Sequence, residues 1–127
     1  MKIHHTAIWV VDLEAERDFF LKYFNCTASK IYLNPSKRFS SCFISFSDGG
    51  RIEIMTKEDV ACRFNSESLG YAHIALDAGS RNEVDNLTAR MRNEGVEIIS
   101  GPRITGDGYY ESVILDPESN RIEIISE

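Results

Sequence analysis

The 127-residue sequence lacks several patterns that mark special classes of protein. No hydrophobic run approaches the roughly 18 residues that a membrane-spanning helix needs. The N-terminal stretch reaches a pair of histidines and then acidic residues too early for a secretory signal. The 14 basic residues are outnumbered by 20 acidic ones and are dispersed, which argues against a nucleic-acid partner. We therefore expect a cytoplasmic protein with no membrane and no nucleic-acid partner.

Cysteine is also scarce. The three cysteines, Cys26, Cys42 and Cys62, are odd in number and share no close metal-type spacing. Reduced thiols are the expected state of such residues in the cytoplasm, and we predict no chemistry for them. With 43% hydrophobic and 27% charged residues, a chain of this length can bury a sizeable core within one domain.

What the sequence does contain is an internal repeat. The segment HHTAIWVVD (4–12) opens the first half and YAHIALDAG (71–79) opens the second. Both are rich in the small and β-branched residues of a strand, and each precedes one helical pattern and three further strand patterns. We therefore predict an α+β fold of two tandem βαβββ modules in a single domain: module one at 1–56, a polar linker at 57–70 and module two at 71–127.

Both predicted helices have start signals in the sequence. Asp12 is a suitable N-cap for a helix at 13–24. Ser80 and Glu83 form a capping box for a second helix, which stops at Gly95. Strands are expected at 28–33, 41–47 and 51–56 in the first half and at 96–100, 109–115 and 121–126 in the second; 34–38 and 100–108 are expected to be mobile loops.

Each half places one glutamate inside a strongly apolar strand, in RIEIM (51–55) and RIEII (121–125). Because side chains alternate along a strand, Glu53 and Glu123 should point away from the neighbouring isoleucines and the helix. The same parity puts His5 and His73 on the face that the helices do not cover, while His4 has the wrong parity. His5 precedes Glu53 by 48 positions (53 − 5), and His73 precedes Glu123 by 50 (123 − 73).

A carboxylate among isoleucines is costly to bury without a partner. A shared cation would be such a partner, because imidazole and carboxylate suit Ni²⁺, Zn²⁺, Fe²⁺, Co²⁺ or Mn²⁺. Taken singly, a strand histidine is more often a surface or hydrogen-bonded residue, and a strand glutamate usually faces solvent. The matched parity and spacing favour a single metal site formed by His5, Glu53, His73 and Glu123.

These segments, together with LDPESNRIEI (115–124), resemble the vicinal oxygen chelate superfamily. The closest resemblance is to glyoxalase I (lactoylglutathione lyase), in the glyoxalase, bleomycin resistance and dioxygenase family, and it covers essentially the whole chain. It implies curved mixed sheets and the metal ligands His5, Glu53, His73 and Glu123. It also implies a homodimer in which each site takes ligands from both subunits. As in other short members, nickel or cobalt is implied more strongly than zinc.

The resemblance further implies an enzyme of methylglyoxal detoxification. Such a lyase or isomerase converts a 2-oxoaldehyde–thiol hemithioacetal to a 2-hydroxyacyl thioester through a metal-stabilised enediolate. A metal-bound carboxylate takes a proton from one carbon and returns it to the neighbouring carbon. By family analogy Glu123 is that base, and Glu53 is the pseudo-symmetric alternative.

Two positions depart from the pattern of the members that use glutathione. Trp9 stands in place of an arginine four residues past the first ligand, and Lys57 in place of an asparagine four residues past the first glutamate. We expect Trp9, Lys57 and Arg103 to bind substrate, with Arg103 or Arg38 supplying the charge absent at Trp9. Packing of Trp9 at a dimer interface is an equal alternative. The substrate is then an adduct of glutathione, of another thiol, or a different α-hydroxycarbonyl compound.

Two other functions stay open. The first is another metal-dependent member of the superfamily, an epimerase or an antibiotic-modifying thiol transferase, which would hold metal without turning over the glutathione adduct. The second is a metal-free protein that binds a small-molecule antibiotic, which would be indifferent to Glu123→Gln.

Overall fold

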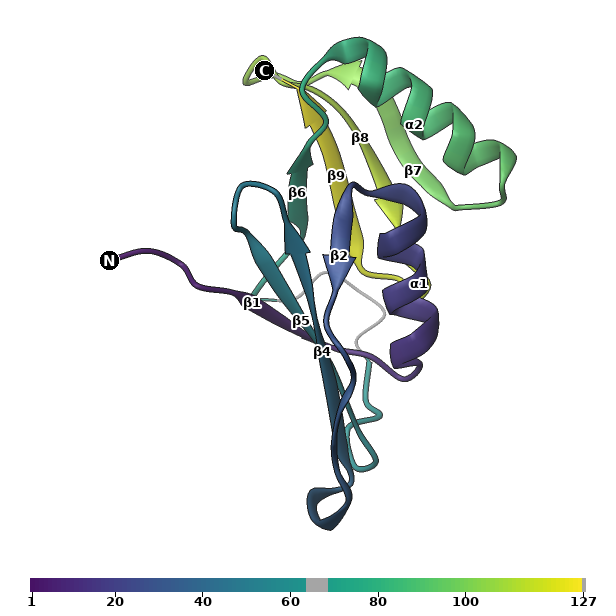
Figure 1. Cartoon of the computed structure of the whole chain (residues 1–127). Helices are drawn as coiled ribbons and strands as arrows, with labels where there is room; N and C mark the ends of the chain where they lie inside the picture. The colour runs from purple at the N-terminus through teal and green to yellow at the C-terminus, as the bar shows by residue number, and fades with distance from the viewer. Residues whose placement is uncertain (64–68, 127) are drawn as a thin grey trace. The chain divides into compact units, whose positions relative to one another are not determined.

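The computed structural model describes residues 1–63 and 69–126, and the chain divides into two compact units, Met1–Arg63 and Phe64–Glu127. Each unit contains one α-helix and one mixed β-sheet (Figure 1). Lys57, the first residue of the predicted linker, is the last residue of a strand, and linker residues 64–68 lie outside the described part.

The first unit follows the βαβββ plan with one interruption. Its sheet has the order β1-β5-β4-β2, and β3 pairs with a further part of β4. β1 and β5 are parallel, and the other pairs are antiparallel. Its elements are β1 (Thr6–Trp9), α1 (Leu13–Tyr23), β2 (Cys26–Ala28), β3 (Tyr32–Asn34), the 3₁₀ helix η1 (Pro35–Lys37), β4 (Phe39–Phe46) and β5 (Arg51–Lys57).

The strand predicted at 28–33 is in fact two short strands. The Ser29 hydroxyl accepts a hydrogen bond of 2.9 Å from the backbone N–H of Phe43, while the backbone N–H of Ser29 donates to the Phe43 carbonyl. A side chain thus takes a backbone donor at the point where β2 ends. The loop predicted at 34–38 instead contains η1, for which Asn34 is the cap.

Helix α1 begins where its cap predicts. The Asp12 carboxylate accepts a hydrogen bond of 2.9 Å from the backbone N–H of Ala15, and Phe24 closes the other end. The buried side of α1 packs against β2, β4 and β5 (Figure 1). Phe20, Ile44 and Ile54 are fully buried between them.

The second unit repeats this plan. Its sheet has the order β6-β9-β8-β7, in which only β6 and β9 are parallel. Helix α2 starts at the predicted Ser80 cap, whose hydroxyl accepts from the Glu83 N–H, and packs against β7, β8 and β9. Its elements are β6 (Ile74–Asp77), α2 (Arg81–Asn93), β7 (Ile98–Ile104), β8 (Tyr110–Leu115) and β9 (Arg121–Ser126).

The loop predicted at 100–108 is wrong over its first half, because β7 continues to Ile104. Glycine and proline favour a loop, but β7 is an edge strand with register shifts at Ser100, a place where both residues are tolerated. Gly101 has φ +84° there, and a Cβ at this position would lie 2.5 Å from the Glu111 carbonyl oxygen. Any larger residue would separate β7 from β8.

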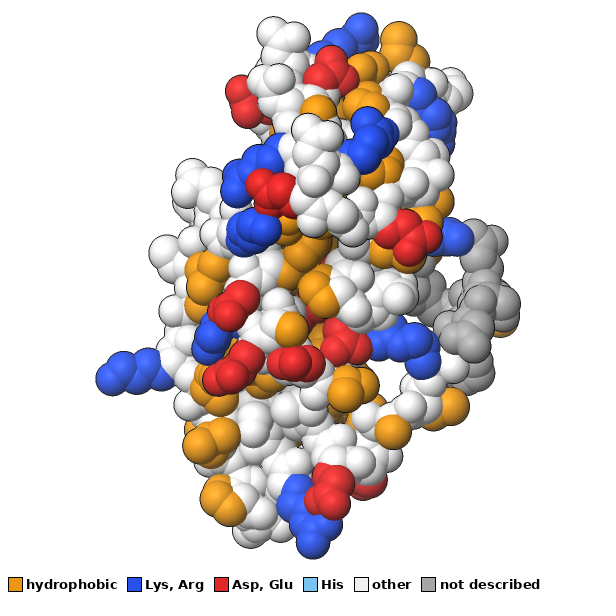
Figure 2. Space-filling model, turned by 90° about the vertical axis from the view of Figure 1, so that its right-hand side faces the viewer, with side chains coloured by type: hydrophobic (Ala, Val, Ile, Leu, Met, Phe, Trp, Pro, Cys, Tyr) orange, Lys and Arg blue, Asp and Glu red, His pale blue; other side chains and the backbone are white. Residues whose placement is uncertain are grey.

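The two sheets and two helices confirm the predicted α+β fold. No helix of the described residues is long and apolar enough to cross a membrane. On the face seen in Figure 2, Lys and Arg side chains are scattered among Asp and Glu side chains.

Candidate metal-binding residues

In the first unit, strand alternation separates the core from the candidate ligands. Ile52 and Ile54 of β5 are buried on the side of α1, and Glu53 between them points to the opposite side. The parallel register sets Ala7 of β1 beside Glu53. His5 lies two residues before Ala7 and therefore continues the same face of the sheet.

This arrangement brings His5 to Glu53. The distance from His5 Nε2 to Glu53 Oε2 is 3.7 Å, and the side chains are 36% and 19% exposed. The rings of His5 and Phe43 form a T-shaped contact, at a centroid distance of 5.4 Å. His4, the histidine of wrong parity, lies outside the pair but contacts His5 through their Nδ1 atoms at 2.8 Å.

The second unit contains an equivalent pair. Ile122 and Ile124 are buried, and the register sets Ala75 of β6 beside Glu123 of β9, as Ala7 is set beside Glu53. The distance from His73 Nε2 to Glu123 Oε2 is 3.2 Å, and the side chains are 41% and 20% exposed. The two units thus present the same pair in the same register and at nearly the same exposure.

The geometry of the second pair fits a first-row cation, and that of the first pair comes close to it. Ligand atoms about 2.1 Å from such an ion lie about 2.9–3.4 Å apart at octahedral or tetrahedral angles. The separation of 3.2 Å falls within this range, and that of 3.7 Å slightly above it. A half-exposed imidazole beside a carboxylate is also a suitable donor set for nickel, cobalt or zinc.

Each pair lies within its own unit. Among residues 1–63 and 69–126, no group of three or more His, Cys, Asp and Glu side chains is placed to hold one ion. The association of all four predicted ligands around a single cation therefore stays a prediction.

A carboxylate not predicted from the sequence lies on the same face as Glu123. Val113 of β8 is paired with Glu123, and Glu111 shares the parity of Val113. Glu111 is buried and lies 3.4 Å from the Arg103 guanidinium. Burial raises the pKa of the Glu111 carboxyl, as does the charge of Glu123, while Arg103 opposes both. The signal in the sequence that could have identified Glu111 is its position as an acid inside the largely apolar strand segment YESVIL (110–115).

The three predicted substrate-binding residues are divided between the two units. Trp9 is 44% exposed on β1, and its ring meets that of Phe39 at a centroid distance of 6.2 Å. Phe39 is paired with Lys57, whose ammonium lies 2.9 Å from Asp59. Trp9 and Lys57 therefore share one region of the first unit. Arg103, in the second unit, pairs with Glu111.

Comparisons with known proteins identify relatives of the whole chain. A family model described as "Glyoxalase/Bleomycin resistance protein/Dioxygenase superfamily" matches residues 2–124. The uncharacterized protein YqjT of Bacillus subtilis (strain 168) is 26% identical over 130 residues, which is 98% of each chain.

Two solved structures show the same fold. A glyoxalase family protein from Enterococcus faecalis has a TM-score of 0.82 at 20% identity, over 98% of this chain and 97% of that one. The trypanothione-dependent glyoxalase I of Leishmania major has a TM-score of 0.79 at 22% identity, over 100% of this chain and 87% of that one.

Proposed function

Because the chain belongs to the glyoxalase/bleomycin resistance protein/dioxygenase superfamily, we propose that it is a metal-dependent lyase of the glyoxalase I type. It converts a 2-oxoaldehyde–thiol hemithioacetal to a 2-hydroxyacyl thioester. The observation that supports this most strongly is the repeated histidine–glutamate pair, His5 with Glu53 and His73 with Glu123, at 3.7 and 3.2 Å. A binding protein without metal chemistry would have no need of two such pairs.

The four residues of the two pairs would hold one divalent cation, Ni²⁺ or Co²⁺ in preference to Zn²⁺. When bound, the cation supplies Lewis-acid stabilisation of the negative charge that develops on two adjacent substrate oxygens. The histidines contribute neutral nitrogen donors, and the glutamates bring the total protein charge of the site to −2.

A glutamate of the site also moves the proton. Glu123 accepts the proton from the substrate carbon that carries sulfur and oxygen, and returns it to the neighbouring carbon. Its side chain is only 20% exposed, which limits exchange of this proton with water. Glu53 is the pseudo-symmetric alternative, at 19% exposure. The base is identified by comparing Glu123→Gln with Glu53→Gln. Loss of the base should lower kcat by about 10²–10⁴-fold.

The deciding experiment is an assay of the methylglyoxal–glutathione adduct. Protein stripped with chelator and reloaded with nickel, cobalt or zinc should form the thioester, and stripped protein should not. Retained metal without turnover of this adduct would indicate another metal-dependent member, such as an epimerase or a thiol transferase. Protein that binds none of the three metals would refute the proposal and favour an antibiotic-binding protein.

Trp9 and Lys57 favour a second candidate in which the thiol is not glutathione. They replace the arginine and asparagine expected of glutathione users, and both face the same region of the first unit. The structural neighbour from Leishmania major is described as trypanothione-dependent. Assaying adducts of several thiols side by side would identify the preferred one.

We also propose that the protein is a cytoplasmic homodimer with sites shared between subunits. Along β1, the residues His5, Ala7 and Trp9 on this face of the first sheet are exposed in the single chain, so a second subunit has a surface to cover. The free thiols of Cys26, Cys42 and Cys62 agree with a reducing compartment.

Mixing two inactive variants tests the shared sites. One variant loses its first pair (His5→Ala with Glu53→Gln), and the other loses its second pair (His73→Ala with Glu123→Gln). If every site joins a first pair from one chain to a second pair from the other, each mixed dimer has one intact site. The mixture should recover about a quarter of wild-type activity. Recovery of none would refute sharing between subunits.

A further inference from the structure

The two histidine–glutamate pairs differ in the charged side chains around them. Both sheets have the same arrangement of strands, so each neighbour of one pair has a counterpart beside the other. Strand alternation puts three counterparts on the glutamate-bearing face of each sheet. They are Phe43 and Val113, Ser41 and Glu111, and Arg51 and Arg121.

A guanidinium is held against the sheet beside the first pair. Arg51 precedes Glu53 by two residues on β5, so their Cα atoms are about 7 Å apart. Cζ of Arg51 lies 4.0 Å from the centroid of the Phe43 ring, and the same ring contacts His5. The buried Nε atom of Arg51 has no hydrogen-bond partner, and no acid of the described residues forms an ion pair with this side chain. Its positive charge therefore opposes a cation at the first pair.

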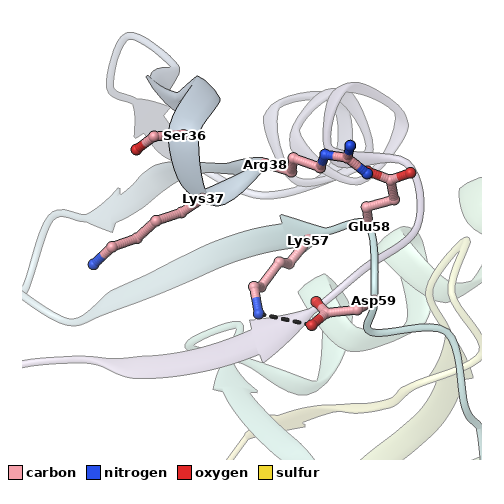
Figure 3. Close-up of a pocket in the computed structure, with 6 residues that line it drawn as sticks. All are labelled: Ser36, Lys37, Arg38, Lys57, Glu58 and Asp59. Carbon is pink, nitrogen blue, oxygen red and sulfur yellow. Dashed lines mark hydrogen bonds and ion pairs between the residues drawn. The ribbon is translucent and has the colours of Figure 1, made fainter.

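The other basic residue of β5 is compensated by an acid. Lys57 lies on the same face of the strand, and its ammonium is 2.9 Å from the Asp59 carboxylate (Figure 3). Arg38, which lies between η1 and β4, likewise forms an ion pair with Glu58. Arg51 thus keeps the uncompensated positive charge of β5.

The corresponding guanidinium of the second unit is placed differently. Arg121, the counterpart of Arg51, is exposed. Val113 stands where the first unit has Phe43, so this position offers no ring on which the guanidinium could stack. Water and salt screen an exposed charge more strongly than one held against the sheet. Arg121 therefore opposes a cation less than Arg51 does.

An additional carboxylate lies beside the second pair. Glu111 is paired with Ile125, two residues past Glu123 on β9, so Glu111 and Glu123 are diagonal neighbours about 7–8 Å apart. Glu111 is buried, and its counterpart in the first unit is the uncharged Ser41. Arg103 lies 3.4 Å from Glu111 but is 51% exposed, so it offsets this charge only in part. The negative charge of Glu111 therefore attracts a cation to the second pair.

We propose that the two pairs bind the cation unequally. The second pair is the primary half of the site, because Glu111 adds negative charge beside it. The first pair is the secondary half, because Arg51 opposes the ion there. The separation of 3.2 Å in the second pair also suits two ligands of one ion better than the 3.7 Å of the first. This inference rests on the metal binding of the proposed function, and it predicts that the second pair holds a cation without the first.

Removing each pair in turn tests the inequality without turnover. Chelator-treated protein is titrated with Ni²⁺ by calorimetry at constant pH and ionic strength. The two variants are His5→Ala with Glu53→Gln, which keeps the second pair, and His73→Ala with Glu123→Gln, which keeps the first. The variant that keeps the second pair should bind nickel at least about ten-fold more tightly, because the two charge effects add.

Single charge changes identify the residues responsible. In the variant that keeps the second pair, Glu111→Gln should lower nickel affinity about three- to ten-fold, as expected for one charge at this distance from a divalent ion in water. Glutamine still offers Arg103 an acceptor. In the variant that keeps the first pair, Arg51→Met should raise the affinity by a similar factor. Glu83→Gln and Arg81→Met, on α2, are the matched controls and should change neither affinity; Arg81 is also stacked on an aromatic ring.

Equal nickel affinities of the two pair variants would overturn the inequality, as would tighter binding by the variant that keeps the first pair. Effects of Glu111→Gln and Arg51→Met no larger than those of their controls would also overturn the proposed cause. Unequal binding without turnover of the adduct would retain the inference and lose the proposed function, and turnover with equal affinities would do the reverse. A wild type that binds no nickel would refute both.

Discussion

Replacing Thr88 by valine is expected to destabilise the second unit through a single buried hydroxyl. Thr88 of α2 and Ser112 of β8 are fully buried, and their oxygens lie 2.6 Å apart. The Thr88 hydroxyl also lies 2.6 Å from the Val84 carbonyl, to which it donates. Because a hydroxyl has only one proton, Ser112 must donate to Thr88. This contact joins α2 to the strand beside β9, on which Glu123 lies.

The direction of these bonds predicts unequal costs. Thr88→Val leaves the Ser112 hydroxyl buried without its acceptor, at a cost of about 1–3 kcal/mol. Ser112→Ala removes a donor but leaves the bond from Thr88 to Val84 intact, so it should cost about 0.5–1.5 kcal/mol. The double variant should be less destabilised than the sum of the two, because no buried hydroxyl is then left without a partner.

These differences are measured by urea unfolding of the wild type, the two single variants and the double variant, with one m-value used for all four. The expected order of the free energy of unfolding is wild type, then Ser112→Ala, then Thr88→Val. The reasoning is refuted if Ser112→Ala costs as much as Thr88→Val, or if the two costs add. Valine matches threonine in shape, so a cavity cannot account for the effect of Thr88→Val.

Three further predictions follow from single residues. Asp12→Ala should lower the free energy of unfolding in urea by about 1 kcal/mol, because the cap of α1 is lost, while Asp12→Asn should stay close to wild type. Cys62 is exposed, whereas burial raises the pKa of the Cys42 thiol, so a thiol reagent should modify Cys62 first in the native protein; equal rates would contradict this. Burial also raises the pKa of Glu111, so the folded state holds this proton more tightly than the unfolded chain, and stability from this group falls as pH rises through the folded pKa. Glu111→Gln should therefore reduce the loss of stability that accompanies a rise in pH above the ordinary pKa range of a glutamate, and an unchanged pH dependence in urea would contradict it.

Strand alternation explains why the face of the sheet that carries these histidines and glutamates was predictable. The period of two is a property of the backbone, and it places Glu53 opposite Ile52 and Ile54 whatever the neighbouring strand is. The caps at Asp12 and Ser80 were predictable for a similar reason, since each bond joins residues three positions apart. Local chemistry alone was sufficient for these faces and caps, whereas the approach of each histidine to its glutamate depends on the parallel pairing of β1 with β5 and of β6 with β9.

Features that depend on pairing between distant strands were not predictable. Glu111 meets Arg103 only because of the register of β7 and β8, and its position beside Glu123 depends on the register of β8 and β9. The continuation of β7 through Gly101 depends on its place at the edge of the sheet. The ion pair between Arg38 and Glu58 likewise joins residues 20 positions apart.

The central claim is that His5, Glu53, His73 and Glu123 bind one cation together, and calorimetric titration with nickel tests it most directly. Chelator-treated protein should bind one Ni²⁺ per chain. Glu53→Gln and Glu123→Gln should each lower the affinity for that same ion, while Glu14→Gln on α1 should leave the affinity unchanged. Two ions per chain, each sensitive to only one of the glutamates, would mean that the two pairs act separately. That result, or no binding at all, would contradict the claim.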